Sequence, residues 1–181
     1  MERERLFGKS LSELSAIAAK ASLPSYTAKQ MAGWLYRRGA PEISGMTDLS
    51  LAARSLLEQE YETGLIAPES VAAGSDGTRK YLFRVSGNRF IETAFIPDRD
   101  RATVCLSVQS GCRMGCRFCM TARQGFQGNL TANEILNQFQ SLPEHGSLTN
   151  IVYMGMGEPL DNLEEVLRSL DILTSGWGYG W

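Results

Sequence analysis

Apolar residues recur at helical spacing in three segments of the first third of the chain. The first segment opens with Ser10 and Glu13 in the pattern of a capping box. The second covers residues 27–38 and the third residues 50–62, and each ends at a glycine. The apolar stripe of the first segment consists of Leu11, Leu14, Ile17 and Ala18. We therefore predict a small helical domain over residues 1–64.

Alternation of apolar and polar residues replaces the helical spacing between Glu69 and Pro97. Asp76-Gly77 and Ser86-Gly87-Asn88 are turn signals on either side of a run with strand composition. This pattern predicts an antiparallel β-ribbon, which we place as a linker over residues 65–98.

Strand and helix patterns then alternate along the chain. The expected strands cover residues 103–109 and 151–154, and the expected helices cover residues 131–142 and 163–174. This order begins a parallel α/β sheet, so we predict the α/β class, with residues 99–181 as the first part of a (β/α) TIM-like barrel. Because two such units cannot close a barrel, we expect an N-terminal portion of a longer protein, with the aromatic residues of 176–181 exposed.

The composition is that of a globular protein. The 181 residues are 43% hydrophobic, and no run of about 18 apolar residues exists, so we expect a cytoplasmic protein with no membrane segment. The net charge of −2 is unlike that of most nucleic-acid-binding domains. Residues 99–128, however, contain five arginines and one acid, which predicts a local basic patch unless these arginines form ordinary surface pairs.

All four cysteines lie between Cys105 and Cys119, where disulfides would close only very small loops. Clustered cysteines in a reducing compartment favour metal or redox chemistry. Cys112, Cys116 and Cys119 are separated by three and then two residues. Three thiolates leave one iron of a [4Fe–4S] cluster open to an outside ligand, here the amino and carboxylate groups of S-adenosylmethionine (SAM).

A zinc site is the alternative for these cysteines. Structural zinc sites usually combine two pairs of ligands, whereas this chain has no second cysteine pair and its single histidine, His145, lies in a loop pattern. The spacing therefore favours the iron–sulfur cluster, and a zinc-holding RNA-binding module remains the non-enzymatic alternative.

The glycine-rich segment Gly155-Met-Gly-Glu-Pro159 follows the predicted strand at residues 151–154. Catalytic groups in α/β sheets gather at the carboxyl ends of strands, so we expect this turn at the same end as the cysteine loop. Gly157 would let the backbone approach an ammonium closely, and Glu158 could pair with it. The turn thus suits the methionine part of SAM.

Two further residues are candidates with open alternatives. Cys105 alternates with apolar neighbours in its strand, so it is either a free thiol near the reacting centre or a buried packing cysteine. Glu92 alternates with Phe90, Ala94 and Ile96, which predicts a desolvated carboxyl on an apolar face. It would then be a proton acceptor, or else a carboxylate satisfied by a neighbouring arginine.

Several of these segments together resemble the RlmN/Cfr family of radical SAM RNA methyltransferases. The resemblance extends through nearly the whole chain. The segments that carry it most clearly are Arg101–Cys105, Cys112–Cys119, Thr121–Phe126, Met154–Pro159 and Ile91–Pro97.

The resemblance implies methylation of carbon 2 of an adenine in 23S rRNA and in tRNA, with a [4Fe–4S] cluster and SAM as cofactors. It also implies that residues 1–64 bind RNA, that Cys105 helps to remove the ring proton and forms a transient disulfide, and that Glu92 is a proton acceptor. A Cfr-like methylation at carbon 8 is the alternative enzyme activity. An electron donor such as flavodoxin is an implied partner, and we expect a monomer.

One position of the family pattern has no counterpart in this chain. The family carries a methyl group on a cysteine near its C-terminus, and no cysteine follows Cys119 here. We therefore expect these 181 residues alone to be inactive, and the full-length protein to be the enzyme.

Overall fold

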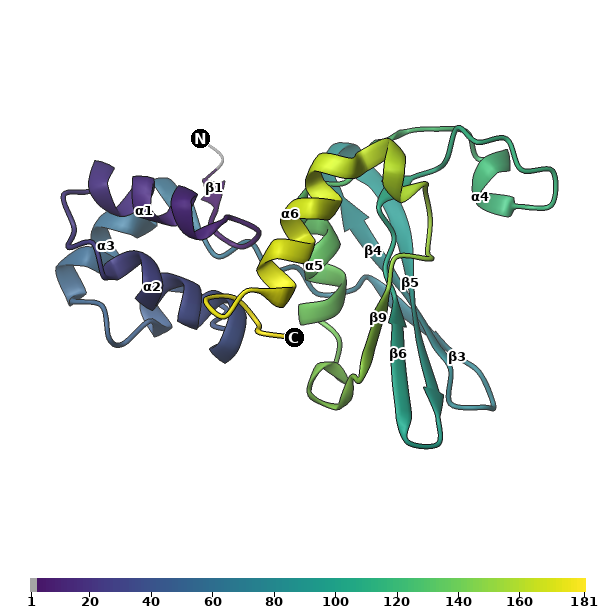
Figure 1. The fold of residues 1–181 in the computed structure, drawn as a ribbon, viewed down its shortest axis with the longest axis horizontal. Coiled ribbons are helices and arrows are strands. Elements are labelled where there is room, and N and C mark those ends of the chain that lie inside the picture. Colours follow the sequence, from purple (N-terminus) through teal and green to yellow (C-terminus); the bar gives the residue numbers. More distant parts are fainter. Residues whose placement is uncertain (1–2) are drawn as a thin grey trace. The chain divides into compact units, whose positions relative to one another are not determined.

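The computed structural model describes residues 3–181, so positions 1 and 2 of the predicted helical domain lie outside the described residues. Contacts divide the chain into two compact units (Figure 1). The helical unit runs to Leu65 and includes Leu167–Trp181, and the sheet unit is Ile66–Val166. These units are defined by packing, and the functional division into 1–64, 65–98 and 99–181 stays a prediction.

The helical unit contains the three predicted helical segments. Its first helix begins with the expected capping box, in which the Ser10 hydroxyl accepts from the Glu13 N–H and the Glu13 carboxylate accepts from the Ser10 N–H at 2.8 Å. Leu14, Ile17 and Ala18 of the expected apolar stripe are buried. The elements are β1 (Glu4–Arg5), α1 (Leu11–Lys20), α2 (Thr27–Ala32), η1 (Gly33–Arg38), η2 (Ile43–Gly45), α3 (Leu51–Glu60) and β2 (Tyr61–Glu62).

Two of these segments differ from the expected continuous α-helices. The second changes from α2 to a π-helix, η1, and ends at Gly39. The third ends at Glu60, because Tyr61–Glu62 pairs in parallel with Glu4–Arg5. Backbone pairing with a segment distant in the sequence thus ends α3 two residues before the predicted limit.

The aromatic residues near the C-terminus were expected to be exposed, which is wrong for two of them. Within the helical unit, the rings of Trp177 and Tyr179 lie 5.8 and 5.6 Å from the ring of Tyr36. The Arg37 Nε–H also donates to the Gly178 carbonyl at 3.0 Å. These contacts bury apolar ring surface, and Trp181 alone stays 47% exposed.

The sheet unit is built on one five-stranded sheet in the order β3-β4-β5-β6-β9. Neighbours from β3 to β6 are antiparallel, whereas β9 pairs in parallel with β6. The predicted ribbon is therefore continuous with the first strands of the α/β region in one mixed sheet. The strands are β3 (Ser70–Ala73), β4 (Arg79–Val85), β5 (Arg89–Asp98), β6 (Arg101–Cys105) and β9 (Asn150–Val152).

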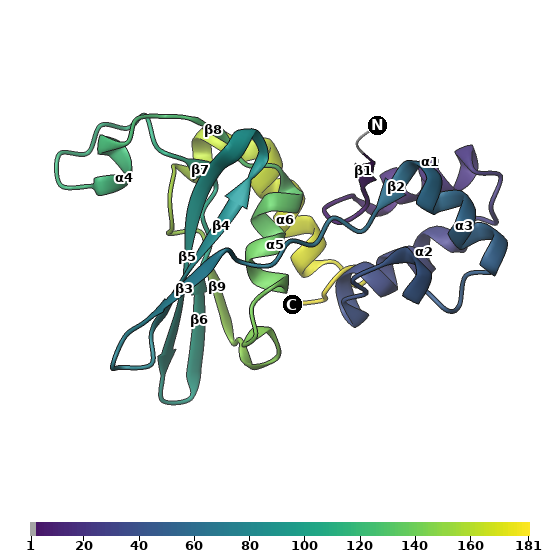
Figure 2. The same cartoon turned by 180° about the vertical axis from the view of Figure 1, so that it is seen from behind.

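Helix α5 (Ala132–Gln140) covers one face of this sheet (Figures 1 and 2). Its apolar residues are buried together with those of one face of β4 and β5, and the Thr93 hydroxyl donates to Gln138 Oε1 at 2.7 Å. Helix α6 (Leu163–Thr174) has its predicted limits. The remaining elements are η3 (Ser86–Asn88), β7 (Gln109–Ser110), α4 (Met120–Arg123), β8 (Gly128–Asn129), η4 (His145–Ser147) and η5 (Pro159–Asn162).

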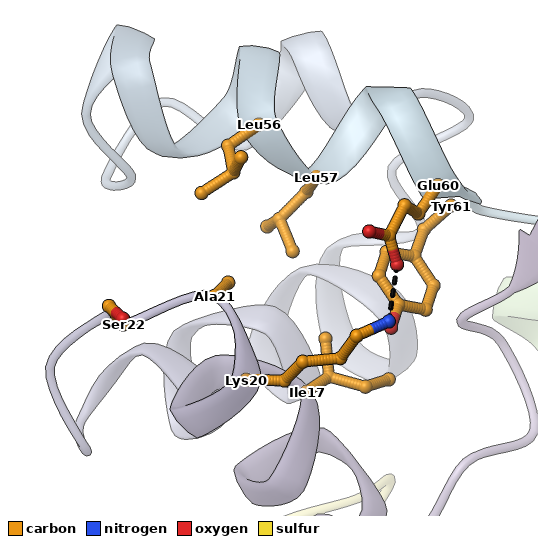
Figure 3. Close-up of a pocket in the computed structure, with 8 residues that line it drawn as sticks. All are labelled: Ile17, Lys20, Ala21, Ser22, Leu56, Leu57, Glu60 and Tyr61. Carbon is orange, nitrogen blue, oxygen red and sulfur yellow. Dashed lines mark hydrogen bonds and ion pairs between the residues drawn. The ribbon is translucent and has the colours of Figure 1, made fainter.

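A pocket of about 270 Å³ lies between α1 and α3 of the helical unit (Figure 3). Lys20 Nζ and Glu60 Oε2 form an ion pair at 2.5 Å beside it. None of the predicted site residues lines this pocket. Across residues 3–181, the helices are too short or too polar to cross a membrane.

Candidate functional site

Two chain segments leave the sheet side by side at the carboxyl ends of β6 and β9. The Leu106 N–H donates to the Val152 carbonyl at 2.8 Å, and the Gly155 N–H donates back to the Leu106 carbonyl at 3.0 Å. Farther along, the Val108 N–H donates to the Met156 carbonyl at 2.8 Å. The segment that enters the cysteine loop and the glycine-rich turn therefore meet at one edge, as the strand order predicts.

The cysteine loop is closed at its base by a second short sheet. β7 pairs in an antiparallel manner with β8, and the Gln127 N–H donates to the Ser110 carbonyl at 2.9 Å. Gly111 has a φ of +70°, and a side chain there would collide with the Gly125 carbonyl oxygen, so only glycine suits the base of the loop. Beyond this base, the segment with α4 extends away from the sheet (Figure 1).

The three loop cysteines are free thiols with different surroundings. Cys112, next to the base, is 9% exposed, whereas Cys116 is exposed and Cys119 is half-buried. Cys119 directly precedes α4, and hydrogen bonds from the backbone N–H groups of Ala122 and then Thr121 lower the pKa of its thiol. Backbone donors thus favour the thiolate form that binds metals.

The donor chemistry suits an iron–sulfur cluster, because three free thiols come from one loop and thiolates are the normal cluster ligands. In the described residues, however, no three His, Cys, Asp or Glu side chains lie close enough together to hold a metal ion. The loop therefore supplies the donors without gathering them in this conformation.

The glycine-rich turn places Glu158 beside the segment that leads into the cysteine loop. Gly157 has a φ of +99°, and a Cβ at this position would lie 2.5 Å from the Cβ of Gln109. The Glu158 N–H donates to Gln109 Oε1 at 3.0 Å, and Glu158 Oε1 accepts from the Leu160 N–H at 3.1 Å. Glu158 is thus held through its backbone N–H and through its carboxylate, at the edge that the strand order predicts.

Cys105 ends β6 as a free, half-buried thiol. Burial raises the pKa of this thiol. In the sheet register Cys105 lies opposite Ala94 of β5 and Val152 of β9. Since side chains alternate along a strand, Glu92 shares the sheet face of Ala94 and Cys105. Two of the predicted site residues therefore lie on one face of neighbouring strands.

The predicted desolvation of Glu92 is wrong. Its side chain is 47% exposed, and Glu92 Oε1 lies 2.9 Å from Lys80 Nζ of β4. The reason is that this face of the sheet carries no covering helix among the described residues, so Phe90 and Ile96 are each 39% exposed as well. Glu92 is thus a paired carboxylate, with a lysine in place of the expected arginine.

The basic patch of the cysteine loop is only partly neutralised. Arg113 Nε lies 3.9 Å from Asp161 Oδ2, and the Arg113 guanidinium stacks on the Phe126 ring at 4.1 Å. Arg117 and Arg123 are exposed and form no ion pair within the described part of the chain. Phe118, between the last two loop cysteines, is 91% exposed. The loop therefore offers cationic and aromatic surface to solvent.

Buried polar residues that sequence reasoning missed hold this edge together. Gln138 of α5 is fully buried, accepts from the Ser107 N–H at 2.8 Å and donates to the Ser107 carbonyl at 2.8 Å. Asn162 Nδ2 donates to the Val108 carbonyl at 2.9 Å. The sequence contained one signal for these residues: each is an amide side chain within a segment whose prediction rested on apolar spacing, and buried amides usually form hydrogen bonds.

Alkylation of the cluster-free protein tests the two shifted thiols. The thiolate is the reactive form, so the lowered pKa of Cys119 gives it more thiolate near neutral pH, and the raised pKa of Cys105 gives it less. We expect iodoacetamide to modify Cys119 several times faster than Cys105, with the gap narrowing as pH rises. Peptide mass spectrometry over time measures both rates. In denaturant the two cysteines should react at equal rates. Equal alkylation rates of Cys105 and Cys119 in the folded protein would contradict the opposite pKa shifts assigned to them.

Two family models match different parts of the chain. Residues 5–63 match the ribosomal RNA large subunit methyltransferase N-terminal domain. Residues 106–176, which include the three loop cysteines and the glycine-rich turn, match the radical SAM superfamily.

Individual proteins match along almost the whole chain. A protein of Parabacteroides distasonis named "Probable dual-specificity RNA methyltransferase RlmN" is 52% identical over 181 residues, which are 100% of this chain and 53% of that protein. The dual-specificity RNA methyltransferase RlmN of Syntrophus aciditrophicus is 43% identical over 100% of this chain and 53% of its own length. A solved radical SAM methyltransferase from Sphaerobacter thermophilus gives a TM-score of 0.89 at 36% identity, over 98% of this chain and 54% of the other. The chain thus spans about half the length of the curated relatives it matches.

Proposed function

Because the chain belongs to the RlmN/Cfr family of radical SAM proteins, we propose that it is the cluster-bearing part of an enzyme that methylates carbon 2 of adenine in 23S rRNA and tRNA. One observation carries the proposal: the cysteine loop and the glycine-rich turn leave adjacent parallel strands at the same edge of the sheet. The printed names of the relatives supply the RNA substrate class.

Cys112, Cys116 and Cys119 are the ligands of a [4Fe–4S] cluster in this proposal. SAM would bind at the iron that lacks a cysteine ligand, and Gly157 and Glu158 would hold its methionine part. When bound and reduced, the cluster would supply the single electron that starts radical chemistry on SAM. An external donor such as flavodoxin provides that electron.

Cys105 and Glu92 act on the adenine from the shared sheet face. Cys105 helps to remove the proton from carbon 2. Its sulfur then bonds to the sulfur of the methyl-carrying cysteine, which has no counterpart in this chain, as the bond from that sulfur to the transferred carbon breaks and the product is released. Removing the proton from carbon 2 requires the thiolate, and the raised pKa of the buried thiol makes Cys105 the stronger base once it has lost its own proton. Glu92 accepts a proton, and its pairing with Lys80 means that this contact must loosen first.

Analysis of modified nucleosides tests the reaction itself. The full-length protein is supplied with SAM, reductant and unmodified tRNA, and the RNA is digested and examined by mass spectrometry against methyladenosine standards. We expect 2-methyladenosine. Recovery of 8-methyladenosine would replace the proposal with the Cfr-like activity, and an unmethylated adenosine pool under conditions that reduce the cluster would overturn both.

A basic groove in the helical unit supports an RNA contact there. Lys29, Arg37 and Arg38 line a groove of about 450 Å³ together with a single acid, Asp48, which pairs with Arg38 at 3.2 Å, so the groove keeps an excess of positive charge. Tyr26, at its edge, is 61% exposed, and a cationic groove with exposed rings suits phosphates and unpaired bases. Elsewhere in the described part of this unit, most cations face acids. These pairs involve Arg3, Arg5, Lys9, Lys20 and Arg168.

Substitution of Lys29 tests the groove. Loss of one phosphate contact should weaken tRNA binding for all sequences and reduce the slope of log affinity against log salt by about 1. The matched control is Lys20→Ala, which removes a lysine from the ion pair with Glu60 on the same unit. Fluorescence anisotropy with labelled tRNA at several salt concentrations measures both variants. An unchanged slope for Lys29→Ala would contradict the assignment of the groove.

We propose that the full-length protein acts as a monomer in the cytoplasm, where its RNA substrates are found.

A further inference from the structure

The Gln109 side chain bonds to both the glycine-rich turn and the returning arm of the cysteine loop. It is fully buried in β7, directly before the loop. Its Oε1 accepts from the Glu158 N–H at 3.0 Å, and its Nε2 donates to Asn129 Oδ1 of β8 at 2.9 Å. A single amide therefore joins three chain segments, using its acceptor for one and its donor for another.

The backbone and the packing at Gln109 strengthen this junction. The Gln109 N–H donates to the Met156 carbonyl at 3.1 Å, so the turn is held from the main chain as well. The missing side chain of Gly157 leaves the space that Gln109 occupies, because a Cβ there would come within 2.7 Å of the Gln109 Cγ. The turn and the glutamine side chain thus determine each other's position.

We propose that Gln109 is a positioning residue for SAM: it fixes the backbone of Gly157 and Glu158 relative to the cysteine loop. This inference rests on the proposed function, since it takes the glycine-rich turn as the part that meets SAM. Gln109 itself supplies no ligand to the cluster and touches no reacting atom. Its loss should therefore weaken SAM binding while leaving the content of iron and sulfide unchanged.

Gln109→Met is the main test variant, because methionine has a similar length and stays apolar in the buried site. It removes both side-chain hydrogen bonds and leaves the Glu158 N–H without its acceptor. We expect SAM affinity to fall about tenfold, which corresponds to about 1.4 kcal/mol, because the Glu158 N–H loses its acceptor and the turn is placed less firmly. The readout is the paramagnetic resonance spectrum of the reduced cluster in the full-length protein, titrated with SAM.

Two further variants separate positioning from a general loss of structure. Gln109→Glu keeps an oxygen for the Glu158 N–H and loses the donor to Asn129, whose own Nδ2 is already bonded to the Asp161 carbonyl, so part of the affinity should return. Gln127→Met is the matched control, since Gln127 also lies at the loop base, accepts from the Ser110 hydroxyl at 3.0 Å and does not contact the turn. It should bind SAM like the wild type.

The outcomes distinguish this inference from the proposed function. A wild-type cluster whose spectrum ignores SAM would contradict the proposed function. If the wild type responds and Gln109→Met titrates identically, Gln109 is not a positioning residue. The inference is equally overturned if Gln109→Met loses its cluster along with its SAM response, or if Gln109→Glu binds no better than Gln109→Met.

Discussion

Cys116→Ala should reduce the iron content of the reconstituted full-length protein to background, and Cys112→Ala and Cys119→Ala should do the same. With one loop cysteine removed, only two of the four irons keep a protein thiolate, so the cluster should not survive purification. Because Cys116 is exposed, its loss should cost little folding stability, which makes it the cleanest of the three variants. Iron and sulfide analysis after anaerobic reconstitution measures the effect.

Cys105→Ala is the matched control for the loop variants, since it removes a thiol outside the loop. It should retain the iron and sulfide of the wild type. Full iron in Cys116→Ala would contradict the ligand assignment, and zinc in place of iron in the wild type would support the alternative zinc module.

Cys105→Ala should also stop turnover and trap RNA covalently on the full-length protein. Without this thiol the ring proton is not removed and the transient disulfide cannot form, so we expect turnover to fall by about 100-fold or more. Labelled tRNA that migrates with the protein on a denaturing gel reveals the adduct. The cluster and its response to SAM should be unchanged, which separates this variant from the loop variants.

Thr103→Ala is the control for that experiment. Thr103 alternates with Cys105 on the same strand, and it should turn over like the wild type because it takes no part in the proposed chemistry. Normal turnover by Cys105→Ala would rule out the role assigned to this cysteine.

Local signals in the sequence were sufficient for most of the secondary structure. The predicted capping box at Ser10 is formed, and a second one forms at Thr131, because a cap depends on residues three positions apart. The turn at Gly87 and Asn88 is also present, with positive φ at both residues. The parallel pairing of β6 with β9 followed from the strand and helix order, and it brought the cysteine loop and the glycine-rich turn to one edge.

Contacts between distant segments account for what the sequence did not reveal. The packing of Trp177 and Tyr179 on Tyr36 joins residues more than a hundred positions apart, which no local pattern records. Glu92 alternates with apolar residues, yet burial depends on what covers that face, and in the described residues nothing covers it. The buried amide of Gln109 acquires its meaning only from its partners Glu158 and Asn129.

Paramagnetic resonance of the full-length protein tests the central claim, that Cys112, Cys116 and Cys119 hold a cluster with one iron open to SAM. The protein is reconstituted anaerobically with iron and sulfide, reduced, and measured before and after SAM is added. We predict the signal of a reduced [4Fe–4S] cluster that changes when SAM binds. A protein that assembles no cluster, or a cluster whose signal is unaffected by saturating SAM, would contradict the claim.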